Sequence, residues 1–254
     1  MTARTDAGSA VDGVLFDIDD TLVDTRAAFA SALAVVAGRY LPDLPAGRHA
    51  ELLAHWRADA ADHYGRYTRG EATYREQRMS RANAMHTEFG GPALDDAGFD
   101  AWDAVFEDGF QAAWSAHDDA AVAVAELLAA GIAVGALSNA ASAYQTLKLE
   151  RAGLLDSVPL LVGVDTLGFG KPDPRVFVEA CRRLGTDPAR TVYVGDELDV
   201  DAVAARRAGM TGVWLDRPGP RRVPVTDADV AASGVVVIHG LAELPAALGI
   251  EAAA

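Results

Sequence analysis

The sequence has few of the residues from which disulfide bridges and zinc sites are built. Among its 254 residues there is one cysteine, Cys181, so no disulfide can form within the chain. The six histidines lack the spacing of a metal-binding pair, which argues against zinc or another borderline metal. Because chains without internal disulfides are typical of a reducing compartment, we expect a cytoplasmic protein.

Positive charge and long apolar segments are also scarce. The chain has 22 Lys and Arg against 37 Asp and Glu, a formal net charge of −15. An acidic surface repels the phosphates of nucleic acids and anionic membranes, so we expect neither as a partner. No apolar run reaches the roughly 20 residues that span a bilayer. Residues 1–12 are mostly small and polar, lack the apolar segment of a signal peptide, and are expected to form a flexible tail.

The spacing of the apolar residues divides the rest of the chain into two kinds of segment. Between residues 26 and 117 it is helical, with helices predicted over 26–40, 49–67, 71–89 and 99–114. We interpret the aromatic residues of this segment as its core. From residue 118 onward, strands alternate with helices, one of them predicted over 199–208, a pattern typical of a parallel sheet. The predicted strands are 13–16, 132–137, 160–164, 191–194, 212–215 and 235–238, and a loop is predicted over 218–225.

Carboxylates follow the first apolar strand, Gly13-Val14-Leu15-Phe16. Asp17 and Asp19 are two residues apart, so they project to the same side of an extended chain. The carboxyl ends of parallel strands are where open α/β sheets bind ligands. Two carboxylates so close suit one ionised nucleophile or metal ligand and one proton donor. The alternative is a turn in which Asp20 and Thr21 cap the next helix, and it accounts poorly for Asp17.

Polar residues also follow later strands. Ser138 and Asp196 each come directly after an apolar run, and Lys171 lies in a loop after a third. If these strands are parallel neighbours, the side chains meet at one edge of the sheet. Oxygen ligands favour Mg²⁺, and an ion, a lysine and two hydroxyl groups would together receive a phosphoryl group. Because no serine or cysteine nucleophile pairs with a histidine, an aspartate nucleophile fits best.

In their order and spacing, these residues resemble the four motifs of the haloacid dehalogenase superfamily, most of whose members are phosphohydrolases. The motifs are Asp17-Ile18-Asp19-Asp20-Thr21, Ser138, Lys171 in GKPDP, and Gly195-Asp196-Glu197-Leu198-Asp199-Val200-Asp201. The resemblance covers nearly the whole chain. It implies a Rossmann-like parallel sheet with helices on both faces, formed by residues 13–24 and 118–254. It also implies an all-helical cap, residues 25–117, inserted between the first and second motifs.

The resemblance implies a role for each motif residue. Asp17 would attack phosphorus, Asp19 would protonate the leaving oxygen and then activate water, and Lys171 would offset negative charge. The implied phosphate ligands are Thr21, Ser138, Asn139 and Lys171, and the implied Mg²⁺ ligands are Asp17, the backbone carbonyl of Asp19, Asp196, and Asp201 at the ion or one layer outside it.

Asp19 also discriminates among reactions, because the dehalogenases of the superfamily lack an aspartate at this place. We therefore expect Mg²⁺-dependent hydrolysis of a small phosphorylated metabolite through an aspartyl-phosphate, by a monomer or homodimer. A phosphomutase or a 2-haloacid dehalogenase-type hydrolase is the enzymatic alternative, and a phosphate-sensing or regulatory binding protein the non-enzymatic one. We interpret four arginines of the helical segment as a solvated face, with contact to an anionic part of the substrate as the alternative. They are Arg69, Arg75, Arg78 and Arg81.

Overall fold

A six-stranded parallel sheet forms the centre of the α/β core, as the sequence predicts. The computed structural model describes residues 11–219, 221 and 224–250, so most of the predicted tail, residues 1–10, lies outside the described range. The strand order is β3-β2-β1-β4-β5-β6, with the first strand of the chain in the interior of the sheet. The strands are β1 (Gly13–Phe16), β2 (Ala133–Leu137), β3 (Leu160–Val162), β4 (Thr191–Gly195), β5 (Thr211–Leu215) and β6 (Val236–Ile238).

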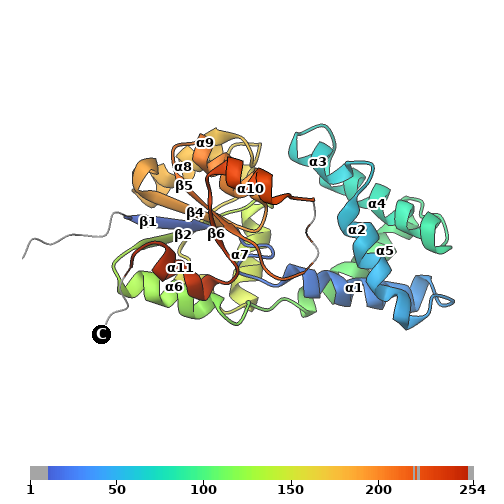
Figure 1. Cartoon of the computed structure of the whole chain (residues 1–254). Helices are drawn as coiled ribbons and strands as arrows, with labels where there is room; N and C mark the ends of the chain where they lie inside the picture. The colour runs from blue at the N-terminus through green and yellow to red at the C-terminus, as the bar shows by residue number, and fades with distance from the viewer. Residues whose placement is uncertain (1–10, 220, 222–223, 251–254) are drawn as a thin grey trace, which may run out of the picture.

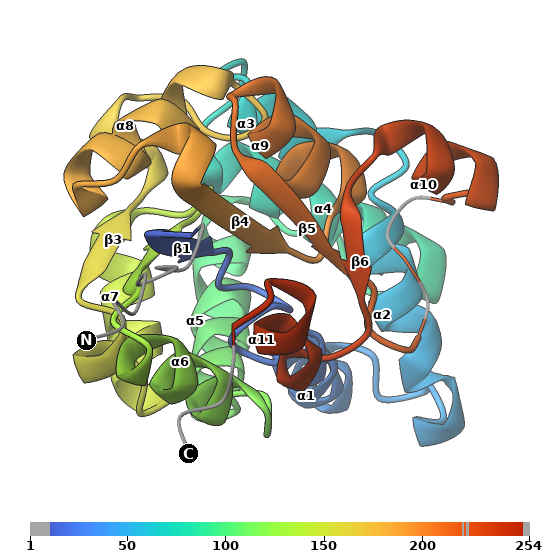
Figure 2. The same ribbon diagram turned by 60° about the vertical axis from the view of Figure 1, so that its left-hand side comes forward.

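Helices cover both faces of this sheet (Figure 2). Val14 and Phe16 of β1 pack into one apolar cluster together with residues of α6, α7 and α11, whereas Leu15 packs into another with residues of α8 and α9. Because β1 is buried on both faces, all of its side chains lie in apolar surroundings, which explains its continuous apolar run. The helices of the core are α6 (Ala120–Ala129), α7 (Ser142–Arg151), α8 (Pro174–Leu184), α9 (Ala204–Arg207), α10 (Asp227–Ser233) and α11 (Leu244–Ala247).

Five helices between β1 and α6 form the cap, to one side of the sheet (Figure 1). Their shared interior is aromatic: the ring of Trp102 stacks with those of Trp56 and Phe106 at centroid distances of 6.0 and 5.3 Å. Aromatic residues dominate such interiors because each buries a large apolar area. The cap helices are α1 (Thr25–Tyr40), α2 (His49–Ala58), α3 (His63–Thr68), α4 (Tyr74–Phe89) and α5 (Asp96–Ala112).

Two predictions about the elements are wrong, and one helix was missed. The single helix expected over 49–67 is divided into α2 and α3, because Asp59 and Asp62 adopt left-handed backbone angles (φ 38° and 55°) that end one helix before the next begins. The helix expected over 199–208 starts as a π-helix, Leu198–Val203, and becomes α-helical only in α9. Helix α10 was not predicted, although Thr226 and Asp229 form a capping box at its start.

Burial also corrects the interpretation of the aromatic residues. The tryptophans and phenylalanines of the cap core are buried as predicted, but Tyr64 and Tyr74 are 39% and 43% exposed. Both rings contact that of Tyr67, with centroid distances of 5.9 and 5.7 Å. Across the described ranges, no helix combines the length and the apolar character needed to cross a membrane.

Candidate active site

The strand order brings the ends of three strands to one edge of the sheet. Phe16 at the end of β1 pairs with Ala136 on β2 and with Val194 on β4. The residues that follow these strands therefore lie side by side at the carboxyl edge, as the sequence predicts. The amide of Asp17 donates to the carbonyl oxygen of Val194 at 2.8 Å, which extends the strand by one residue. Ile18 is fully buried in the core, so Asp17 and Asp19 project from the opposite side of the chain.

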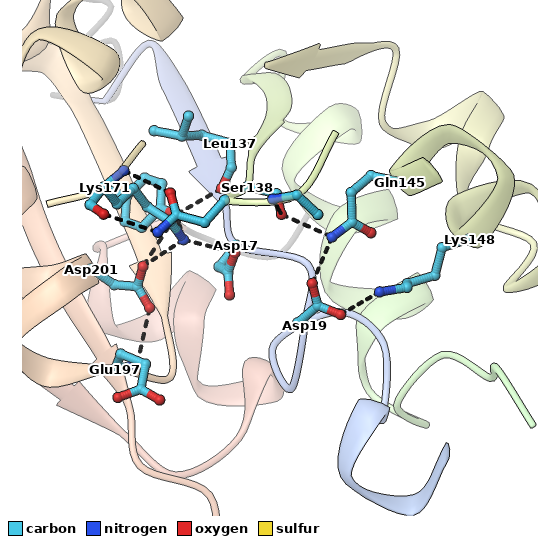
Figure 3. Close-up of polar contacts among 12 residues, drawn as sticks. Asp17, Asp19, Leu137, Ser138, Gln145, Lys148, Lys171, Glu197 and Asp201 are labelled. Carbon is cyan, nitrogen blue, oxygen red and sulfur yellow. Dashed lines mark hydrogen bonds and ion pairs between the residues drawn. The ribbon is translucent and has the colours of Figure 1, made fainter. Parts of the chain in front are cut away.

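Figure 3 shows Lys171 beside Asp17 and Asp201. Its Nζ donates to Oδ1 of Asp17 at 2.8 Å, to Oδ1 of Asp201 at 2.7 Å and to the hydroxyl of Tyr193 at 2.8 Å. Burial alone would lower the pKa of Lys171, but the Asp17 and Asp201 carboxylates outweigh it and hold the pKa well above its usual value. The ammonium group therefore stays charged beside Asp17 at neutral pH.

The backbone of Lys171 is held by Asn139. The amide N–H of Lys171 donates to Oδ1 of Asn139 at 2.6 Å, and Nδ2 of Asn139 donates to the carbonyl oxygen of Lys171 at 2.9 Å. A Cβ on Gly170 would lie 2.2 Å from Oδ1 of Asn139, so this close approach requires glycine. The side chain of Asn139 thus positions the lysine loop, and its predicted contact with phosphate remains a prediction.

Three carboxylates at this edge could hold a metal ion. Asp17, Asp196 and Asp201 each offer an oxygen, and these oxygens lie within 4.8 Å of one another. Burial, with the neighbouring charges of Asp201 and Asp19, raises the pKa of Asp17 to about 7 against the opposing effect of Lys171. Burial and then the carboxylate of Asp20 raise the pKa of Asp196 well above its usual value. One lysine is therefore too little positive charge for this cluster, and its all-oxygen donor set fits Mg²⁺.

The two predicted hydroxyl ligands are free to donate. The Oγ1 of Thr21, in the turn after Asp19, is buried and has no hydrogen-bond partner within the described ranges. The Oγ of Ser138 accepts from the amide of Ala140 at 3.2 Å and from Nε2 of Gln145 at 2.8 Å. Because both of these contacts use lone pairs of the serine oxygen, its hydrogen remains available to a phosphate oxygen.

Asp19 lies at the more open side of the site, with 38% of its side chain exposed. Its Oδ2 accepts from Nε2 of Gln145 at 2.6 Å, and its Oδ1 forms an ion pair with Nζ of Lys148 (Figure 3). Neither donor was predicted to be a site residue. The spacing of Gln145 and Lys148 was the available signal, because residues three apart share one face of a helix.

Tyr193 was missed for a different reason. It occurs in the middle of β4, where every residue is buried, and therefore has the pattern of a core aromatic. Its hydroxyl donates to the carbonyl oxygen of Leu137 at 2.9 Å and accepts from Lys171. A buried tyrosine needs a partner for its hydroxyl, and that need was the only hint in the sequence.

Asp20 serves the structure around the site. Its φ is 57°, and its Oδ1 accepts from Oγ1 of Thr25 at 2.9 Å and from the amide of Arg26 at 2.6 Å, at the start of α1. Its Oδ2 accepts from Arg57 of α2 at 2.6 Å, which ties the cap to the loop after β1. The capping alternative is therefore wrong for Thr21 and for the position of the cap, because α1 begins at Thr25 with Asp24 as its N-cap residue; Asp20 only assists by accepting from the amide of Arg26.

The cap also reaches the site. In Tyr64 of α3, burial raises the pKa of the hydroxyl, and the charge of Asp19 raises it further. No pattern in the sequence distinguishes Tyr64 from the other tyrosines of the cap.

The interpretation of the four cap arginines as a solvated face is wrong for two of them, Arg78 and Arg81. Arg69 and Arg75 are about half exposed, as predicted. Arg78 is buried, pairs with Asp103 and Glu107 at 2.7 and 2.5 Å, and lies 4.3 Å from the ring centroid of Phe106. Arg81 is also largely buried. Its guanidinium group lies 4.1 Å from the ring centroid of Trp56 and donates to the carbonyl oxygen of that residue at 2.6 Å.

Comparison with known proteins identifies the family. A family model described as haloacid dehalogenase-like hydrolase matches residues 11–209. Over 101 residues, the chain is 38% identical to glyceraldehyde 3-phosphate phosphatase of Methanopyrus kandleri. That match covers 40% of this chain and 43% of the relative, so it spans less than half of the relative's length.

Other similarities extend over nearly the whole chain. The ribulose-1,5-bisphosphate 5-phosphatase of Halopiger xanaduensis is 28% identical over 231 residues, 90% of this chain and 94% of that protein. The magnesium-bound HAD-hydrolase YfnB of Bacillus subtilis has the same fold, with a TM-score of 0.76, 22% identity, and coverage of 94% of this chain and 99% of that one. The family match, supported by this fold, shows that the chain belongs to the haloacid dehalogenase-like hydrolases.

Proposed function

We propose that the protein hydrolyses a small phosphomonoester in a Mg²⁺-dependent reaction that passes through an aspartyl-phosphate on Asp17. The observation that carries the proposal is the buried ammonium group of Lys171, which contacts both Asp17 and Asp201 in a cluster of acids. This arrangement suits transfer of a phosphoryl group, because such transfer depends mainly on positioning and on neutralising charge. The relatives whose names specify phosphatases of small phosphorylated metabolites support the same class of substrate.

In the first step, an oxygen of Asp17 attacks phosphorus and the bond from phosphorus to the leaving oxygen breaks. Asp19, which shares the exposed side of the chain, donates a proton to the leaving oxygen. Lys171 offsets the charge of the nucleophile, and the hydroxyls of Thr21 and Ser138 donate to phosphate oxygens. When bound by Asp17, Asp196 and Asp201, a magnesium ion would supply the remaining positive charge and lower the pKa of Asp17.

In the second step, water attacks the phosphorus of the aspartyl-phosphate. Asp19, now ionised, accepts a proton from that water, and the bond between Asp17 and phosphorus breaks. Inorganic phosphate leaves and the Asp17 carboxylate is restored. The helical cap, residues 25–117, would cover the site during these steps and supply substrate contacts; Tyr64, whose pKa the charge of Asp19 raises, is a candidate for such a contact.

The experiment is a phosphate-release assay on the purified chain, with p-nitrophenyl phosphate and a panel of phosphorylated metabolites. We expect turnover that requires Mg²⁺, is abolished by a chelator and is absent in Asp17→Asn. The matched control is Asp43→Asn, the same change at an exposed loop position, which should turn over normally. Turnover by Asp17→Asn at the wild-type rate would overturn the proposed nucleophile.

A further inference from the structure

Helix α7 presents two buried polar side chains to one carboxylate. Gln145 and Lys148 are 0% and 2% exposed, and their spacing places them on the same face of the helix. Gln145 donates to Oδ2 of Asp19 at 2.6 Å, while Lys148 pairs with Oδ1. Each oxygen of Asp19 therefore has its own donor on one rigid element (Figure 3).

Lys148 is enclosed by aromatic rings. Its Nζ lies 5.5, 5.3 and 5.4 Å from the ring centroids of Phe110, Trp114 and Tyr144, within the range of cation–π attraction. Phe110 belongs to cap helix α5, whereas Tyr144 belongs to α7 of the core, so the enclosure joins both parts of the molecule. Within the described ranges, the carboxylate that pairs with this buried ammonium group is Asp19.

Gln145 connects Asp19 to the phosphate-binding edge. Its Nε2 donates to Asp19 and also to Oγ of Ser138 at 2.8 Å, so the two hydrogens of one amide hold two site residues in fixed relation. Without such donors, an aspartate side chain can adopt several rotamers about its two bonds. Proton transfer requires a fixed orientation, because small displacements of a reacting group are costly in rate.

We propose that Lys148 is a positioning residue for Asp19: with Gln145, it fixes the orientation of the carboxyl group that exchanges protons with the leaving oxygen and with water. The inference rests on the proposed function. Because Lys148 is almost fully buried behind Asp19, it acts through that carboxylate and makes no contact with the phosphoryl group. Its removal should therefore slow a reaction in proportion to how much that reaction needs the proton from Asp19.

The experiment compares two substrates of nearly the same shape. Phenyl phosphate releases a basic phenolate that needs the proton, whereas p-nitrophenyl phosphate releases a weakly basic one that needs it much less. In Lys148→Met, which keeps the length of the chain inside the aromatic rings, we expect kcat/KM for phenyl phosphate to fall about tenfold more than for p-nitrophenyl phosphate. Lys148→Arg keeps a positive charge and should bring the ratio of the two kcat/KM values back toward that of the wild type.

The control is Arg151→Met, on the same helix, where the guanidinium group lies 5.5 Å from the ring centroid of Trp114. It should change both substrates equally. If Lys148→Met does not fold, as judged by thermal unfolding, Gln145→Met provides the same test with the aromatic enclosure intact.

An unchanged ratio of the two kcat/KM values would overturn the inference, because an equal loss on both substrates would make Lys148 a merely structural residue. A rise in KM alone would overturn it as well, since Lys148 would then contact the substrate. Failure of the wild-type chain to hydrolyse either ester would instead refute the proposed function, so the two failures are distinguishable.

Discussion

In the core, a buried lysine lies among acids that outnumber it, whereas in the cap, a buried arginine lies among aromatic rings. Lys171 contacts Asp17 and Asp201, and Asp196 completes a cluster whose negative charge one lysine does not balance. Arg78 has two carboxylate partners, both from the neighbouring helix α5, and is packed against Phe106. Burial of charge is common to both places, so burial alone does not mark a site.

The two places differ in whether their polar groups have bonding capacity left for a ligand. Around Lys171, the acids and the hydroxyls of Thr21 and Ser138 converge on one edge of the sheet and have bonding capacity left for a ligand. Around Arg78, the partners Asp103 and Glu107 join α4 to α5 and so hold the cap together. We therefore expect substitutions around Lys171 to affect chemistry, and substitutions around Arg78 to affect stability.

Lys171→Met should have the largest effect. Loss of the ammonium group leaves the phosphoryl site with less positive charge, and we expect turnover to fall by about 10³-fold. Inhibition of the residual activity by inorganic phosphate should disappear, which titration with phosphate will measure. Normal inhibition by phosphate in this variant would contradict the distinction between Lys171, expected to act on the ligand, and Arg78, expected to stabilise the cap.

Asp19→Asn should have the next largest effect, because the amide cannot give up or accept the proton that each step needs. We expect kcat for p-nitrophenyl phosphate to fall by about 10²-fold. The unfolding midpoint should fall as well, because the change leaves the buried ammonium group of Lys148 without its carboxylate partner. An unchanged kcat would mean that another group transfers the proton.

Arg78→Met sharpens the comparison from the side of the cap. Removing the guanidinium group leaves Asp103 and Glu107 without their shared partner, and we expect the free energy of unfolding to fall by about 2 kcal/mol. Denaturant titration will measure it. Inhibition by phosphate should persist in the folded variant, and its loss would assign Arg78 to ligand binding.

The smallest effect should come from an ion pair of the core that lies outside the acid cluster. Asp119 accepts from Arg217 at 2.7 and 3.0 Å and from the amide of Leu241 at 2.8 Å. Burial would raise the pKa of Asp119, but Arg217 and this amide lower it below the ordinary 3.8. A lowered pKa stabilises the fold above the ordinary value, and the contribution is lost as the pH falls through the lowered one.

Asp119→Asn should therefore lower the free energy of unfolding by about 1 kcal/mol at neutral pH, and by less near pH 3. Unfolding of both proteins across this pH range will show whether the difference shrinks. A difference that stays constant with pH would mean that Asp119 contributes through packing and not through its charge.

Site residues at the ends of strands could be predicted because a recognisable apolar run precedes them in the sequence. Asp17 follows an unbroken apolar run, and parallel strands in one sheet end at the same edge. The six-stranded sheet and the helical cap follow from the same patterns. Residues on helix faces could not be predicted in this way. Whether Gln145 and Lys148 face Asp19 or solvent depends on how α7 packs, and a single sequence does not contain that information.

The cap arginines show the same limit. Arg75, Arg78 and Arg81 recur every three residues in α4, a spacing that fits a solvated stripe. The partners that allow Arg78 to be buried, Asp103 and Glu107, lie on another helix about 25 residues later, between large aromatic residues. Only the packing of α4 against α5 brings them together.

The most direct test of the central claim is chemical trapping of the enzyme during turnover. Borohydride reduces an acyl phosphate to an alcohol, so an aspartyl-phosphate on Asp17 would become homoserine at that position, which peptide mass spectrometry can detect. We predict homoserine at residue 17 when the protein turns over p-nitrophenyl phosphate with Mg²⁺, and none without substrate. Turnover with unmodified Asp17, or homoserine at another aspartate, would contradict the account.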